Sequence, residues 1–271
     1  MNEVTKKDAA ALEFMTQASA AQYTGFENLE EGMLSIPFLK IAQPNSPELL
    51  SDDGKKNKLA AGDMFNSVTG RNYGAAVNMV FLGFDRAYLE WGEGLGDFKG
   101  RISPQELDQL ITSGQVGKQI MKDGSEGFNF SRVMDASKIQ ETYTFMVLLP
   151  EFTEDGVMLL SFKATGLKHV RRILTKARAQ RIKLPDGQVI PAHLYAVIWA
   201  VKTVLNKSDL GQWFLLGDKK TVAVDAIGNM LEDKWQPVQK AVIDAAMFVK
   251  ETQFSKVSLA GTRDATPESE E

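Results

Sequence analysis

The chain has 271 residues, of which 44% are hydrophobic and 24% are charged, and its net charge is −4. Such a chain is long enough to bury a substantial core, and its composition is typical of a soluble globular protein. It contains no Cys and only two His, which excludes disulfides, thiolate nucleophiles, Cys-ligated zinc and a His-rich metal site.

Residues 1–25 are Ala-rich and polar, and they predict a mobile N-terminal arm. The acidic residues near their start and the lack of an apolar run exclude a secretory signal. No apolar run in the chain approaches the length that spans a bilayer. We therefore expect a soluble, cytoplasmic protein without a membrane partner.

Several strands are expected in the first third of the chain. Residues 38–42 form an apolar segment bounded by prolines, which is typical of a strand at a sheet edge. Residues 51–58 are charged and predict a solvated loop, and residues 62–74 predict a hairpin around Thr69 and Gly70. Residues 77–91 begin as a continuous apolar run and end in alternation, so we expect a strand that is buried first and half exposed later.

Residues 92–140 are Gly-rich and polar, and we interpret them as an insertion or long loop that contains one helix. Ser103 at the cap, Pro104 in the first turn and Glu106 three residues after the serine favour a helix over residues 103–112. Residues 143–163 predict a second hairpin, because two apolar runs flank a polar connection with Asp155 and Gly156.

The remaining elements continue this pattern of strands and turns. Residues 184–204 predict a turn and a long strand, and residues 212–216 pair back after a turn at 206–211. Residues 221–253 have helical apolar spacing, whereas residues 255–271 lose all periodicity and form a disordered acidic tail. The order of elements predicts an α+β fold, with one domain over residues 26–254: a mainly antiparallel barrel or sandwich with helical additions.

Residues 156–185 carry eight Lys or Arg and no Asp or Glu. The whole chain is −4, so this segment of +8 leaves −12 for the remaining residues. Basic charge segregated within an acidic protein usually serves a polyanionic partner. The eight cations are Lys163, Lys168, Arg171, Arg172, Lys176, Arg178, Arg181 and Lys183.

The basic segment predicts an amphipathic helix over residues 166–181, with Thr165 as its N-cap. At about 100° per residue, one face gathers Leu167, Val170, Ile173, Leu174 and Ala177. The opposite face gathers Lys168, Arg172 and Lys176, flanked by Arg171 and Arg178. These like charges repel one another, and a polyanion relieves that repulsion. A solvated helix face is the alternative, and a membrane surface ranks below nucleic acid because the apolar face has no aromatic anchor.

Single-stranded nucleic acid is held by cationic grooves and by aromatic faces on which bases stack. Alternation along the strand that starts at His193 puts Tyr195 and Trp199 on one face. Tyr73 follows Arg71 at a spacing of two, as Tyr88 follows Arg86, so each ring shares a strand face with a cation. We expect these four aromatic residues to stack on bases, with core packing as the alternative for each.

No phosphate-binding loop, nucleophile elbow or HExxH motif occurs in the chain. Asp85, Glu90 and Asp97 with Lys99 are the side chains from which a metal-dependent nuclease centre could be built, but their spacing does not favour one. We expect no enzymatic activity, no cofactor and no metal.

Five stretches, taken in order, resemble a family of tailed-bacteriophage proteins: GMLSIPFLKIAQPNSPEL, GDMFNSVTGRNYG, RAYLEW, SFKATGLKHVRRILTKAR and NKSDLGQWFLL. Members of that family are often described as single-stranded-DNA-binding or replication-associated proteins. The resemblance covers residues 32–216 and is poor at residues 92–140. It implies an OB-fold-like barrel that coats single strands during phage replication or recombination. Many single-strand binders end in an acidic segment closed by an apolar or aromatic residue that docks on partner proteins, and this tail departs from that pattern because it ends without an aromatic residue. Three roles stay open for it: capture of replication or recombination proteins, folding back over the basic face in competition with DNA, and a disordered solubilising end.

The sequence therefore predicts a sequence-nonspecific single-stranded-DNA-binding protein in the host cytoplasm, and it leaves oligomerisation open. The first alternative is an interaction protein that docks on a replication, recombination or host factor, and the second is a metal-dependent nuclease. The expected DNA contacts are Lys163, Lys168, Arg171, Arg172, Lys176, Arg178, Arg181, Arg71, Tyr73, Arg86, Tyr88, Tyr195 and Trp199.

Overall fold

The computed structural model describes residues 36–92, 97–120, 126–135, 137–163, 166–183, 187–208, 211–217 and 224–251. By its internal contacts the chain divides into Met1–Ser35 and Ile36–Glu271, and all described residues belong to the second unit. The predicted N-terminal arm, the acidic tail and the expected helix cap Thr165 lie outside the described residues.

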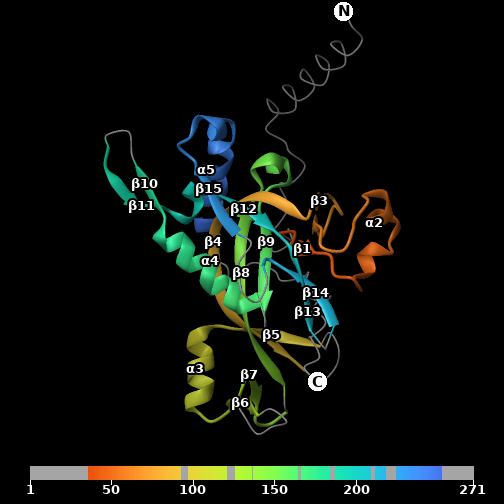
Figure 1. The fold of residues 1–271 in the computed structure, drawn as a ribbon. Coiled ribbons are helices and arrows are strands. Elements are labelled where there is room, and N and C mark those ends of the chain that lie inside the picture. Colours follow the sequence, from red (N-terminus) through yellow and green to blue (C-terminus); the bar gives the residue numbers. More distant parts are fainter. Residues whose placement is uncertain are drawn as a thin grey trace, which may run out of the picture. The chain divides into compact units, whose positions relative to one another are not determined.

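The described residues form mainly short strands with a few helices (Figure 1). The helices, including 3-10 turns labelled η, are η1 (Pro47–Leu49), α2 (Asp52–Lys56), α3 (Pro104–Thr112), η2 (Pro150–Asp155), α4 (Leu167–Ala179), η4 (Leu194–Ala196), η5 (Asp233–Trp235) and α5 (Gln236–Glu251). The strands are β1 (Leu39–Ile41), β2 (Met64–Asn66), β3 (Asn72–Gly74), β4 (Ala76–Trp91), β5 (Phe98–Ile102), β6 (Val116–Ile120), β7 (Glu126–Arg132), β8 (Lys138–Leu148), β9 (Met158–Lys163), β10 (Arg181–Lys183), β11 (Val189–Pro191), β12 (Val197–Lys202), β13 (Val204–Ser208), β14 (Gly211–Leu215) and β15 (Val224–Asn229).

An eight-stranded sheet is built around the long strands β4 and β8. Its order is β15-β12-β4-β8-β7-β6, while β5 pairs with β4 and β9 pairs with β8. The other strands form the sheets β1-β2-β3, β10-β11 and β13-β14, and all these pairings are antiparallel. The predicted α+β, mainly antiparallel class is therefore confirmed. Within the described residues the strands close no barrel, so the OB-like architecture is not confirmed.

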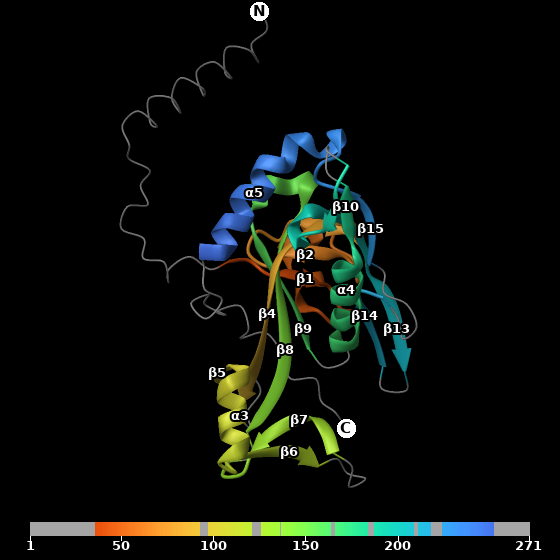
Figure 2. The same cartoon turned by 90° about the vertical axis from the view of Figure 1, so that its left-hand side faces the viewer.

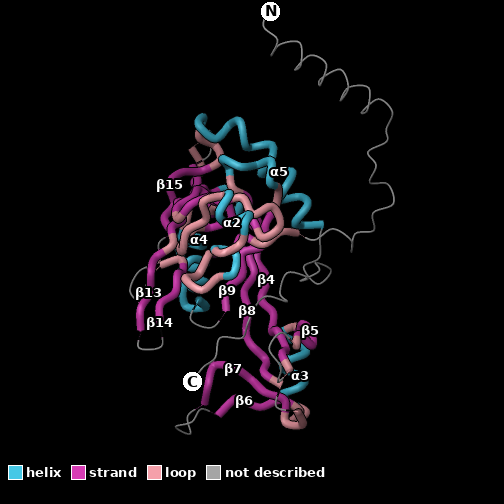
Figure 3. The backbone as a smooth tube through the Cα atoms, turned by 90° about the vertical axis from the view of Figure 1, so that its right-hand side faces the viewer, coloured by secondary structure: helices cyan, strands magenta, loops and turns pink. Residues whose placement is uncertain are grey.

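β4 and β8 connect two halves of the main sheet, as Figures 2 and 3 show. The first residues of β4 pair with β12, whereas residues 88–91 pair with β5 on the same side of the strand. The second half is a lobe of β5, β6, β7 and the far ends of β4 and β8, with α3 packed on it. The described residues of the segment 92–140, which was expected as an insertion or loop, therefore extend the sheet and supply part of a small core.

Both faces of the first half of the sheet are buried, which explains the continuous apolar run in β4. Met79 and Phe81 face the core that includes α4 and the β1-β2-β3 sheet. Val80 and Leu82, one residue out of phase, face the core that includes α5. α4 and α5 thus cover opposite faces of one sheet (Figure 2).

Several expected elements are present with shifted bounds. The hairpins at 62–74 and 143–163 are confirmed, and the Ser103–Glu106 capping box begins α3 as predicted. The expected loop at 51–58 contains the short helix α2. The expected long strand at 184–204 is divided into β11, η4 and β12. The helix expected over 221–253 is wrong for its first part, where residues 224–229 form β15, and the α-helix α5 begins only at Gln236.

Candidate nucleic-acid interface

α4 carries the basic face that the sequence predicts. It runs over Leu167–Ala179, with Gly166 at the N-cap position. Val170 and Ile173 are fully buried and Ala177 is nearly so, so this side of the helix is fixed against the sheet. The opposite side holds Thr175, Ala179 and what we call the basic face of α4: Lys168, Arg171, Arg172, Lys176 and Arg178.

Lys176, a member of the basic face, has an acidic partner from another element. Its Nζ donates to Asp225 Oδ1 at 2.9 Å and to the Val224 carbonyl at 2.8 Å. Asp225 lies on β15, far along the chain, so the local sequence gives no sign of it. Residues 156–185 contain no acid, but the fold brings one to Lys176 from a distant strand. Within the described residues, Lys168, Arg171 and Arg178 have no carboxylate at ion-pair distance.

The basic surface continues from α4 into β10. Arg181 is exposed at the start of β10, and its Nη1 donates to the carbonyls of Arg178 and Gln180 at 3.0 and 2.9 Å. A cation at the C-terminus of a helix satisfies free carbonyls and favours the helix dipole. Lys183 is exposed two residues later, while Lys163 is half-buried at the end of β9.

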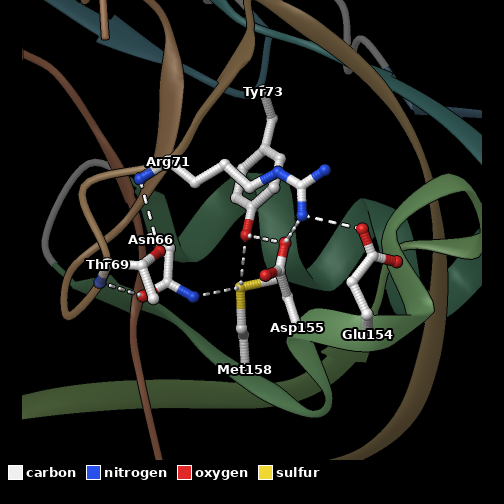
Figure 4. Close-up of polar contacts among 7 residues, drawn as sticks. All are labelled: Asn66, Thr69, Arg71, Tyr73, Glu154, Asp155 and Met158. Carbon is white, nitrogen blue, oxygen red and sulfur yellow. Dashed lines mark hydrogen bonds and ion pairs between the residues drawn. The ribbon is translucent and has the colours of Figure 1, made fainter. Parts of the chain in front are cut away.

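Arg71 and Tyr73 connect the β2–β3 hairpin to η2 (Figure 4). Arg71 Nη1 lies 2.8 Å from Glu154 Oε1 and 3.0 Å from Asp155 Oδ2, and its guanidinium lies 4.6 Å from the Phe152 ring centre. The Tyr73 hydroxyl donates to Asp155 Oδ2 at 2.8 Å.

The charged groups of this cluster are paired with one another. Hydrogen bonding to Glu154 raises the pKa of Arg71, and burial followed by the bond to Asp155 raises the pKa of Tyr73. Tyr73 is 7% exposed, so its ring offers little surface for a base. With two carboxylates on one guanidinium, the cluster does not form a cationic site.

Arg86 and Tyr88 make the same kind of internal contact in the lobe. Arg86 Nε donates to Glu141 Oε1 at 2.7 Å and its Nη2 to the Tyr88 hydroxyl at 2.6 Å. Tyr88 is buried against the edge of Phe130, and burial raises the pKa of its phenol. Both Arg-x-Tyr pairs are thus used to join neighbouring segments, and neither tyrosine has an open ring face.

Trp199 and Tyr195 do not share a strand face, because residues 194–196 form a 3-10 turn and β12 begins at Val197. Trp199 is 0% exposed and packs in the core with Phe81, so its expected role as a stacking surface is wrong. Tyr195 is half-buried and stacks on His193, with ring centres 5.4 Å apart. It is the one predicted stacking residue in the described residues that is not fully buried.

The carboxylates considered for a nuclease centre do not converge. Asp85 pairs with Arg101, and Glu90 lies on the opposite face of β4, where it accepts from Arg132 Nε at 2.6 Å and Nη2 at 3.0 Å. Lys99 binds Asp135 at 2.6 Å. Among the described residues, no group of three or more His, Asp or Glu side chains is arranged to hold a metal ion.

A family model described as Pam3 phage gp34-like protein matches residues 5–241. The chain belongs to the Pam3 phage gp34-like protein family. This match confirms that it is a member of a phage protein family. No curated protein and no solved structure matches it.

The gp34-like chain also has features that the sequence alone did not indicate. Asp225 is one, because its contact with Lys176 depends on how β15 pairs with β12. A second is a cavity of about 530 Å³ beside that ion pair, bounded by the start of β4, η2, the end of β12 and β15. In the part of the chain that the structure describes, no helix is both long and apolar enough to cross a membrane.

Proposed function

We propose that this Pam3 phage gp34-like protein is a non-enzymatic, sequence-nonspecific single-stranded-DNA-binding protein of the host cytoplasm that acts in phage replication or recombination. The observation that carries the proposal is the basic face of α4. Four of its five cations are exposed, and the fifth, Lys176, is partly exposed.

The packing of α4 supports this proposal because it holds the cations in place. Lys168 and Arg178 are ten residues apart, so the exposed charges extend over about 15 Å at 1.5 Å per residue. Like charges on one helix face cost free energy when they have no counter-ion. A nucleic-acid backbone supplies those counter-ions, and binding is then driven by release of its condensed cations.

Stacking now has less support than phosphate binding. Tyr73, Tyr88 and Trp199 are buried, and Tyr195 is covered in part by His193. The proposed preference for single strands therefore depends on Tyr195 and on the resemblance to phage single-strand binders. We expect affinity to come mainly from phosphate contacts and to tolerate changes of base sequence.

A titration of fluorescent oligo-dT, compared with a duplex of equal length at several salt concentrations, tests the proposal. We expect tighter binding to the single strand and a log–log salt slope of about −2 or steeper, since each neutralised phosphate of a single strand contributes about −0.7. Absence of binding at low salt contradicts the proposal. Equal affinity for the duplex supports the phosphate site on α4 and contradicts the proposed preference for single strands.

Two further measurements, made beside this titration, distinguish DNA binding from the two alternative functions. Capture of a purified replication or host protein without oligonucleotide binding indicates an interaction protein. Shortening of the labelled oligonucleotide in Mg²⁺ or Mn²⁺ indicates a nuclease, and it should be checked on a denaturing gel.

A further inference from the structure

The chain that leaves α4 forms the hairpin of β10 and β11, which projects past the end of the helix (Figure 1). Arg181 lies opposite Pro191 in this hairpin, and Lys183 lies opposite Val189. Residues directly opposite one another in an antiparallel pair share a face, and so do residues two apart along a strand. All four residues are exposed, whereas Ile182 between the two cations is buried. The hairpin therefore has one covered face and one solvent face.

His193 extends the solvent face of this hairpin. The Ala192 N–H donates to the Gln180 carbonyl at 3.1 Å, so the pairing continues past Pro191 in the same register. His193 has an extended backbone (φ −65°, ψ 152°), and exposure still alternates, with Ala192 half-buried between two exposed residues. His193 thus lies on the same face as Arg181 and diagonally across from it, a separation that a long side chain can reach.

Tyr195 holds the His193 ring in place. The two rings are parallel within 4°, with their centres 5.4 Å apart, which is the offset-stacked arrangement that aromatic pairs favour. Tyr195 is half-buried and packs against the core that includes α5, so the stack is attached to the body of the protein. His193 itself is exposed. Its ring therefore offers a positioned aromatic surface to a ligand.

Arg181 connects this aromatic surface to the basic face of α4. Its Nη1 donates to the carbonyls of Arg178 and Gln180 in the last turn of the helix. A guanidinium has five N–H donors, which is more than these two bonds use, and Arg181 is exposed. Lys183 adds a second cation to the same face of the hairpin. Cations and a ring surface are thus combined on one face, as in sites that hold single strands.

We propose that the solvent face of the β10–β11 hairpin contacts the bases of the bound strand: one unpaired base stacks on His193, and the neighbouring phosphates bind Arg181 and Lys183. Histidine is one of the side chains on which unpaired bases stack. Such a stack tolerates any base, because every base has a π face. In a duplex the neighbouring base pairs cover these faces, so the contact favours single strands. The inference rests on the proposed function and assigns its single-strand preference to a residue.

The test measures binding of the full chain to fluorescent oligo-dT and to an abasic strand of equal length, which keeps the phosphates and lacks the bases. The readout is the ratio of the two affinities. His193→Ala should lower this ratio about tenfold, within the range of one base–aromatic stack, and should leave the salt slope unchanged. His193→Phe keeps a ring and should keep the ratio. His193→Lys supplies a cation without a ring and should lower the ratio as His193→Ala does.

Two control variants separate the ring from other effects. Phe248→Ala removes an exposed ring from α5 and should keep the ratio. Arg181→Gln combined with Lys183→Gln should flatten the salt slope for both strands by about 1.4, since each of two phosphates contributes about 0.7, and should also keep the ratio.

The outcomes distinguish this proposal from the proposed function. An unchanged ratio in His193→Ala, with salt-dependent binding of oligo-dT retained, overturns the hairpin proposal and leaves the proposed function standing. A ratio that His193→Lys keeps and His193→Phe loses also overturns the hairpin proposal, because His193 then acts through charge. Failure of the wild type to bind either strand at low salt overturns the proposed function, together with the inference that rests on it.

Discussion

The basic face of α4 and the arginines of the sheet use the same kind of side chain in opposite ways. Arg71, Arg86 and Arg132 each lie within hydrogen-bond distance of a carboxylate from another segment. On α4, Lys168, Arg171 and Arg178 have no such partner among the described residues. The difference indicates that a cation in this chain is available for a ligand only where the fold brings no acid beside it.

The physical reason lies in the neighbours that each element has. A strand residue lies beside partners that are set by sheet register, and these can come from anywhere in the sequence. An exposed helix face has mainly its own residues three and four positions away as neighbours, and here those are basic. Lys176 is the intermediate case, because the edge strand β15 brings Asp225 to the end of α4.

The largest effect is expected among the arginines of the sheet, as a loss of stability when Arg132 is replaced. Glu90 is 8% exposed and is held by two hydrogen bonds from Arg132, so Arg132→Ala leaves a buried carboxylate without its partner. We expect a loss of about 3 kcal/mol in the free energy of unfolding. Urea denaturation measures it. Arg132→Ala combined with Glu90→Gln should recover part of the loss, and a single variant as stable as the wild type would contradict the internal role of Arg132.

A smaller effect is expected at Tyr73, with a characteristic pH dependence. Tyr73→Phe removes the bond to Asp155 and should cost about 1 kcal/mol near neutral pH. Burial raises the pKa of Tyr73 above its ordinary value, so the unfolded chain loses this proton first. The contribution is complete below about pH 10 and falls as pH rises further. Denaturation at pH 8 and pH 11 should show a smaller pH-dependent loss in Tyr73→Phe than in the wild type.

Local sequence signals predicted some elements well. The capping box of α3, the long strand β4 and the two faces of α4 follow from residues that are close together in the chain. The contacts between distant segments could not be predicted from these local signals. Trp199 is buried because both faces of the sheet are covered at β12, with Trp199 in one core and Ile198 in the other. Arg71 is neutralised by acids of η2. A spacing of two in sequence identifies a shared face, but not whether that face is covered.

Asp225→Asn should give the smallest effect, and it should be a gain in DNA affinity, whereas the two variants above lose stability. The variant frees Lys176 from its acidic partner at little cost in stability, since exposed ion pairs contribute about 1 kcal/mol or less. If phosphates lie along α4, oligo-dT should bind more tightly and the salt slope should steepen by about 0.7, the contribution of one more neutralised phosphate. Weaker binding than the wild type would indicate that Asp225 itself holds the strand.

The central claim is that phosphates bind the basic face of α4, and the salt slope of oligo-dT binding tests it most directly. Lys168→Gln, Arg171→Gln and Arg178→Gln together remove three unpaired cations from α4. Lys56→Gln, Lys240→Gln and Lys250→Gln, on α2 and α5, remove the same charge elsewhere. We expect the α4 variant to have a slope shallower by about 2 and the control to keep the wild-type slope. Equal slopes for both variants would contradict the account.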